Sequence, residues 1–130
     1  MIDELFKPDC KYKRVFICGK ITGDIGYRAK FRRAAAVLTD AGFHVMNPAT
    51  LPSEGFTHEE YMTVTLAMLS VCDAVFFLYD WMDSPGAIEE IDKATRDGKP
   101  GFSFEMWLTE YQKRENKVPS PVVLDGGVQG

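Results

Sequence analysis

Three residues in the second half of the chain, Ser84, Gly86 and Glu90, have types and spacing that suit chemistry on a small ligand. Ser84 and Gly86 stand at the expected start of a helix, where unpaired backbone N–H groups attract an anion such as phosphate. Glu90 follows about one and a half turns later, at the border of the apolar side of that helix, and could lean into a neighbouring crevice. Each also has a plain structural interpretation, Ser84 as an N-cap and Glu90 as a solvated border residue.

A second candidate site is the loop Gly19-Lys20-Ile21-Thr22-Gly23, which follows a short apolar run. Its spacing matches neither the phosphate-binding loop of nucleotide hydrolases nor the glycine fingerprint of dinucleotide-binding proteins. It nevertheless offers two glycines, backbone N–H groups and one lysine at the expected edge of a sheet. The alternative is an ordinary tight turn between a strand and a helix.

Apolar runs alternate along the chain with segments of helical periodicity. Short apolar runs predict five strands, at residues 14–18, 43–46, 74–79, 101–103 and 122–124. Periodic segments, capping residues and glycine stops predict four helices, at residues 27–41, 57–71, 84–96 and 105–115.

This alternation predicts an α/β fold, a flavodoxin- or Rossmann-like parallel sheet of five strands with helices on both faces. The simplest strand order is 2-1-3-4-5, which places a topological switch point between the first and third strands. The loops 19–24 and 80–86 then meet where ligands bind in such sheets. We expect an N-terminal extension over residues 1–13, a single domain over 14–125 and a tail over 126–130.

The remaining polar candidates are ambiguous. Trp81 could stack on a planar base or cover the sheet edge, and Asn47 could hydrogen-bond a base or form a routine turn before Pro48. In the helix carrying Glu90, the predicted sheet-facing stripe is apolar throughout: Ala87, Ile88, Ile91 and Ala94. We assign His44 and His58 structural roles, and residues 61–69 to the core or to a dimer face.

The composition excludes several classes of protein. The formal net charge of −4 disfavours a bulk nucleic-acid partner, and no apolar run approaches the length of a membrane span. Three cysteines at long spacings and two histidines predict neither a disulfide framework nor a metal site. We expect reduced thiols in a cytoplasmic protein.

Four stretches of the chain resemble the nucleoside 2-deoxyribosyltransferase-like family, which includes 2′-deoxynucleoside 5′-monophosphate N-glycosidases and a group frequent in phages. The most specific is the pattern Ser84-x-Gly86-Ala87-x-x-Glu90 within residues 81–100. The others match the opening strand and glycine loop, the middle strand and a Gly-Phe-x-Val-x-Asn-Pro segment, over residues 15–23, 72–78 and 42–48.

The resemblance implies cleavage or exchange of the N-glycosidic bond of a deoxynucleotide or deoxynucleoside, with Glu90 as the nucleophile that forms a glycosyl-enzyme. It implies a homodimer and a nucleotide or nucleoside as the small-molecule partner, with no metal and no organic cofactor. Two groups of residues are expected to bind substrate, on the phosphate side and on the base side respectively: Gly19, Lys20, Thr22, Gly23, Ser84 and Gly86; Asn47 and Trp81.

Three positions depart from the family pattern. Thr65 stands where the family often has an aspartate, Phe16 where active members commonly have a tyrosine, and Lys20 where a small residue or proline is usual. Thr65 and Phe16 support an alternative, a nucleotide-binding or sensor module that uses the same pocket without turnover. A third hypothesis, a redox or flavin protein, lacks the expected Ser/Thr-rich phosphate loop after the first strand.

Overall fold

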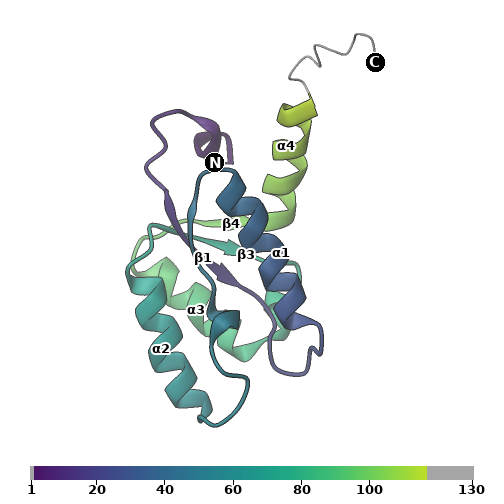
Figure 1. The fold of residues 1–130 in the computed structure, drawn as a ribbon. Helices are drawn as coiled ribbons and strands as arrows, with labels where there is room; N and C mark the ends of the chain where they lie inside the picture. The colour runs from purple at the N-terminus through teal and green to yellow at the C-terminus, as the bar shows by residue number, and fades with distance from the viewer. Residues whose placement is uncertain (1, 117–130) are drawn as a thin grey trace.

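A parallel sheet with helices on both faces forms the fold in the computed structural model, which describes residues 2–116 (Figure 1). The strands follow the order β2-β1-β3-β4, and their bounds are β1 (Arg14–Cys18), β2 (His44–Met46), β3 (Ala74–Phe77) and β4 (Gly101–Ser103). The helices are α1 (Tyr27–Asp40), α2 (His58–Ser70), α3 (Pro85–Arg96) and α4 (Phe104–Asn116). Single 3-10 turns are η1 (Ile2–Phe6), η2 (Pro48–Thr50) and η3 (Trp81–Asp83).

The α/β class and the order of the first four strands are confirmed. The described part of the chain holds four strands rather than the predicted five. The difference arises because the fifth predicted strand, at residues 122–124, lies outside the described residues, as do the expected domain end and tail.

Strand β1 lies at the centre of the topology because it pairs in parallel with both β2 and β3. Phe16 is in register with Met46 on one side and with Val75 on the other. The chain therefore leaves β1 toward one edge of the sheet and later returns toward the opposite edge, so the switch point lies between β1 and β3.

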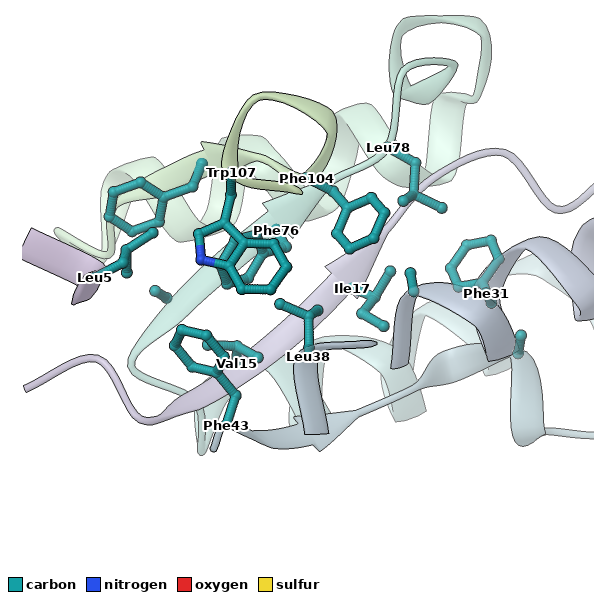
Figure 2. Packing of buried hydrophobic residues seen from close by; sticks show 14 of the residues in the cluster. Leu5, Val15, Ile17, Phe31, Leu38, Phe43, Phe76, Leu78, Phe104 and Trp107 are labelled. Atoms are coloured by element: carbon teal, nitrogen blue, oxygen red, sulfur yellow. The ribbon is translucent and has the colours of Figure 1, made fainter. Parts of the chain in front are cut away.

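Alternation along β1 divides the core between the two faces of the sheet. Val15 and Ile17 pack with α1 and α4, whereas Phe16 and Cys18 pack with α2 and α3. Figure 2 shows the larger core, in which Trp107 of α4 meets aromatic and aliphatic side chains from the sheet, from α1, from the turn between α1 and β2 and from the segment before β1: Leu5, Val15, Leu38, Phe43 and Phe76.

Local capping explains where the helices begin. Thr57 and Glu60 form the predicted capping box at the start of α2, with each side chain accepting from the other residue's backbone N–H. Ser84 is the N-cap of α3 and Pro85 its first residue, as predicted. After α1, Gly42 adopts a φ of 103°, a conformation that glycine accepts without strain. No helix among residues 2–116 is both long and apolar enough to cross a membrane.

Candidate functional site

A cavity of about 630 Å³ lies at the carboxyl edge of the sheet, on the side covered by α2 and α3. The loop after β1 and the start of α3 form two of its walls, and the segment 48–56 with the first turns of α2 forms the others. Its volume lies in the range of cavities that bind drug-sized or nucleoside-sized ligands. The two loops nominated by the topology therefore do meet at a cavity.

Glu90 lines this cavity and is only 6% exposed. Ile88, predicted to face the sheet, is 45% exposed, so the predicted stripe is wrong at this position. Helix α3 is rotated so that Ala87, Glu90 and Ala94 form its buried row. Two alanines allow α3 to approach the sheet closely, and the carboxyl group between them reaches the cavity rather than solvent.

The surroundings of Glu90 favour its protonated form. Burial raises the pKa of Glu90 to about 7, and hydrogen bonds with Thr65 and Cys18 offset part of that effect. Burial also raises the pKa of the Cys18 thiol, so it stays neutral, and it donates to the carbonyl of Ala87 at 3.3 Å. Glu90 is thus a desolvated carboxyl group whose neighbours Thr65 and Cys18 are both neutral.

The first turn of α3 is open to the cavity. Ser84 Oγ accepts a hydrogen bond from the Ala87 N–H at 3.1 Å. A Cβ added to Gly86 would lie 3.4 Å from Met62 Sδ and 3.7 Å from His58 Cε1, so a side chain here would fill the space between α3 and α2. The absence of a side chain leaves the positive end of the helix accessible to a ligand.

A cluster centred on Lys30 of α1 fixes the loops behind the cavity. Its Nζ donates to the Lys20 carbonyl at 2.9 Å, to Asp24 Oδ2 at 2.6 Å and to the buried carboxylate of Asp80. Burial alone lowers the pKa of Lys30, but its two carboxylate partners raise it more. Because Asp80 Oδ1 also accepts from the Lys20 N–H at 3.0 Å, the cluster joins the loop after β1 to the loop after β3.

Five of the nine site residues predicted from the sequence line the cavity together, in two groups from the two loops: Gly19 and Thr22; Ser84, Gly86 and Glu90. Gly19 lies against Leu78, the residue that follows β3, and a Cβ added at Gly19 would come within 2.9 Å of the Leu78 side chain. Glycine therefore lets these two chain segments approach closely without displacing the buried Leu78 side chain.

The other four predicted residues do not belong to the lining among the described residues. Lys20 and Gly23 lie in the first loop but outside the cavity wall, and Lys20 contacts the Asp80 carboxylate through its backbone. Asn47 caps the turn η2 by accepting from the Ala49 N–H at 2.9 Å. The Trp81 ring packs on Phe77 with centroids 5.7 Å apart.

Sequence reasoning missed the wall that α2 contributes. The sequence pattern predicts only a structural role for His58 and a core or dimer-face role for residues 61–69. The cavity is lined by four residues of this helix: His58, Tyr61, Met62 and Thr65. Their spacing, with offsets of three, four and seven residues, places them on one face of a helix. That spacing was visible in the sequence, but an apolar stripe alone does not distinguish a cavity wall from core.

Three contacts involve the residues of this wall. Tyr61 donates its hydroxyl hydrogen to the Pro52 carbonyl at 2.7 Å, and its ring meets Phe56 edge-on with centroids 5.7 Å apart. His58 Nε2 lies 3.7 Å from Glu89 Oε1, and both side chains are exposed, so the first turn of α2 lies beside α3 here. Over residues 2–116, no three side chains of metal-binding type gather into a group that could hold an ion.

Comparison with known proteins gives a family match. Residues 13–100, more than half of the chain, match the model of a family described as "Domain of unknown function (DUF4406)". This range includes β1, the cavity-lining part of α2 and the whole of α3. No curated protein and no solved structure matches the chain.

Proposed function

The chain belongs to the DUF4406 family, and we propose that it cleaves or exchanges the N-glycosidic bond of a deoxynucleotide or deoxynucleoside. The observation that carries this proposal is the position of Glu90, a buried carboxyl group lining a nucleoside-sized cavity at the switch point of a parallel sheet. The resemblance of the Ser84-x-Gly86-x-x-x-Glu90 pattern to nucleoside 2-deoxyribosyltransferase-like proteins supports the same reaction.

The reaction proceeds in two displacements at the anomeric carbon of the sugar. A Glu90 carboxylate oxygen bonds to C1′ while the bond from C1′ to the base nitrogen breaks, and the base leaves with that electron pair and gains a proton. Water then attacks C1′, loses a proton and releases Glu90 together with the free sugar. When a second base attacks instead of water, the product is a new nucleoside.

Burial of Glu90 favours this chemistry through the charge that develops on the sugar. The sugar resembles an oxocarbenium ion in the transition state, and a carboxylate in dry surroundings stabilises that positive charge more strongly than it would in water. The unreacted sugar carries no such charge, so the transition state gains more than the bound substrate does.

The proposed binding positions follow from the walls of the cavity. The first turn of α3, with Ser84 and Gly86, would hold the 5′-phosphate or 5′-hydroxyl together with Gly19 and Thr22 of the first loop. The aromatic wall that includes Tyr61 would face the base. Lys20, Gly23, Asn47 and Trp81 remain proposed contacts that would require movement of their side chains or loops toward the ligand.

Chromatography of base release from a panel of deoxynucleosides and their monophosphates tests the proposal. We expect Glu90→Gln to lose at least about a thousandfold in rate, because the nucleophile is absent. Glu89→Gln is the matched control, since Glu89 is exposed on the same helix and should keep most of the activity. Below pH 7 the rate should fall about tenfold per pH unit, as the carboxylate of Glu90 takes up a proton. If no base is released from any substrate, the proposal is refuted.

A second candidate is a nucleotide-binding module that performs no turnover. It is favoured by the lack of a carboxylate at Thr65 and of a hydroxyl at Phe16, because these departures leave Glu90 with neutral neighbours. Calorimetric binding of a deoxynucleotide without base release, and with unchanged affinity in Glu90→Gln, would support this candidate over the first.

The resemblance also implies a homodimer, which we propose for this chain. Helix α2 is apolar on several sides, and Val64 and Val71 are about half exposed although its inner face already packs on the core. A helix of this kind is normally covered on both sides. Sedimentation velocity tests the pairing, and a monomer at high micromolar concentration would contradict it.

A further inference from the structure

The first turn of α3 leaves few backbone donors for an anion. Pro85, the first residue of the helix, has no N–H. The Ala87 N–H donates to Ser84 Oγ at 3.1 Å, and the Ile88 N–H donates to the Ser84 carbonyl at 2.9 Å. The Gly86 N–H is therefore the one donor of this turn for which the described residues supply no acceptor. A hydroxyl oxygen needs one such donor, whereas the oxygens of a phosphate together need several.

The basic side chains of the neighbouring elements are engaged by the protein itself. Both terminal nitrogens of the Arg28 guanidinium donate to backbone carbonyls, Nη1 to Ala49 at 2.8 Å and Nη2 to Leu51 at 3.0 Å. Lys30 Nζ is shared among the Lys20 carbonyl and two carboxylates. The cavity lining formed by the described residues contains no lysine and no arginine. A phosphate here would thus find no side chain with a permanent positive charge.

Two carboxyl groups line the cavity instead. Asp83 directly precedes the N-cap Ser84, so it stands at the end of the cavity that the first turn of α3 forms, and Glu90 follows further along the helix. His58 also lines the cavity and can become positive, but its Nε2 lies 3.7 Å from Glu89 Oε1, and that carboxylate offsets its charge. A 5′-phosphate carries about two negative charges at neutral pH, so these carboxylates would repel it.

We propose that the cavity takes the uncharged deoxynucleoside and rejects its 5′-monophosphate, and that Asp83 sets this preference. The proposal rests on the proposed function for the class of ligand, a deoxyribose joined to a base. The 5′-hydroxyl would accept from the Gly86 N–H and donate its hydrogen to the Asp83 carboxylate, so each group has a partner. A phosphate oxygen in the same position has no hydrogen to donate and meets that carboxylate as a like charge.

The preference is tested by calorimetric binding of a deoxynucleoside and of its 5′-monophosphate, taken as pairs that share one base. Glu90→Gln is the parent protein for these titrations because it suppresses turnover. We expect the nucleoside to bind at least about tenfold more tightly than the monophosphate. Asp83→Asn in the same parent removes the charge and keeps an oxygen acceptor, and it should tighten monophosphate binding at least about threefold.

The matched control is Asp92→Asn, which makes the same change in net charge on the same helix. The Asp92 side chain is 68% exposed, lies 3.5 Å from Arg96 Nε and is outside the described lining of the cavity. Its substitution should leave the ratio of the two affinities as it is in the parent protein. Circular dichroism confirms that each variant is folded before it is titrated.

A second measurement needs no nucleoside. In wild-type protein labelled with nitrogen-15 at glycine, the Gly86 amide signal is followed by NMR during additions of inorganic phosphate. The signal is assigned by its loss in Gly86→Ala. We expect it to stay in place, because one N–H beside carboxylates does not hold a phosphate ion. A saturable shift of this signal would overturn the proposal.

The outcomes for the preference and for the reaction are distinguishable. Equal or tighter binding of the monophosphate overturns the preference, and an affinity ratio that Asp83→Asn leaves unchanged overturns the role of Asp83. Preferred binding of the nucleoside without base release supports the preference while the proposed reaction fails. Base release from monophosphates with a kcat/KM equal to or above that of nucleosides overturns the preference while the reaction stands. If neither ligand binds, both proposals are wrong.

Discussion

Burial of Glu90 should make the stability of the protein fall with rising pH, in the direction opposite to that of an ion-paired carboxylate. The pKa of Glu90 is raised to about 7 in the folded protein from an ordinary value of 4.5. Between these values the folded protein keeps a proton that the unfolded chain has released, so each step up in pH favours unfolding. The contribution is fully present below pH 4.5 and is lost as the pH passes through 7.

The size of the effect follows from the shift. Each pKa unit corresponds to about 1.4 kcal/mol, so a rise from 4.5 to about 7 removes on the order of 3 kcal/mol of stability. That is a large fraction of the total stability of a small domain, which is about 5–15 kcal/mol. The effect should therefore be measurable despite contributions from other groups.

The perturbation is Glu90→Gln, which keeps the shape of the side chain and removes its titration. Urea unfolding of both proteins is measured from about pH 4.5 to about pH 8, and the free energies of unfolding are subtracted at each pH. Contributions from the other ionisable groups cancel in this difference. We expect the free energy of unfolding of the variant to rise by about 3 kcal/mol relative to that of the wild type as the pH increases over this range.

The dependence of this free-energy difference on pH tests whether Glu90 is desolvated in the folded protein. A difference that stays flat with pH would show that Glu90 titrates as an exposed carboxyl group does. A difference of opposite sign would show that the folded protein stabilises the carboxylate, as a nearby cation would. Either result would refute the assignment of Glu90 as a desolvated group with neutral partners.

Three further substitutions test the framework around the site by urea unfolding at neutral pH. Lys30→Met leaves the buried carboxylate of Asp80 without its cation and should cost about 3 kcal/mol. Gly19→Ala places a methyl group within 2.9 Å of Leu78 and should cost about 1–3 kcal/mol. Trp107→Ala empties the centre of the larger core and should cost about 3–5 kcal/mol.

Each of these has a matched control elsewhere in the chain. Lys93→Met breaks a partly exposed ion pair with Asp97 and should cost less than about 1 kcal/mol. Gly101→Ala meets only ordinary contacts at 3.6 Å, and Trp81→Ala removes a ring from the periphery of the smaller core. If a control variant loses as much stability as its partner, the structural reason given for that partner is wrong.

The sequence was sufficient to predict elements whose signals are local. The capping box at Thr57 and Glu60, the Ser84-Pro85 start of α3 and the glycine after α1 each act within one turn of backbone, and each predicted a boundary to within one or two residues. The strand order followed from the alternation of strands with helices and from the right-handedness of the crossover connections, which also depend on neighbouring elements. Together these placed the two site loops at one edge of the sheet.

Features that depend on distant residues were not predictable. Lys30 reaches Asp80 across 50 positions, and Arg28 donates to the Ala49 and Leu51 carbonyls. Both basic residues lie on a helix whose periodicity alone indicates solvent exposure. Whether such a side chain finds a partner depends on the positions of distant loops. Local sequence patterns do not determine those positions.

The rotation of α3 was missed for a more instructive reason. Hydrophobicity predicts that Ile88 is buried and that Glu90 lies at the border of the apolar face. In the structure Ile88 is exposed and Glu90 is buried, and each of these placements lowers the stability of the fold. Half-exposing an isoleucine forgoes about 1 kcal/mol, and burying the carboxyl group costs on the order of 3 kcal/mol above neutral pH. A rotation of α3 by one residue would recover much of this, yet the small Ala87 and Ala94 pack inward instead.

A local arrangement that opposes the hydrophobic effect persists where it serves something other than stability. Among the described carboxylates, Asp80 is also buried, but its ion pair with Lys30 offsets the desolvation of its charge. Glu90 has no such cation and instead faces a cavity from a helix turned to present it. A cavity ligand that becomes positively charged as it reacts, as in the proposed reaction, would compensate for that burial.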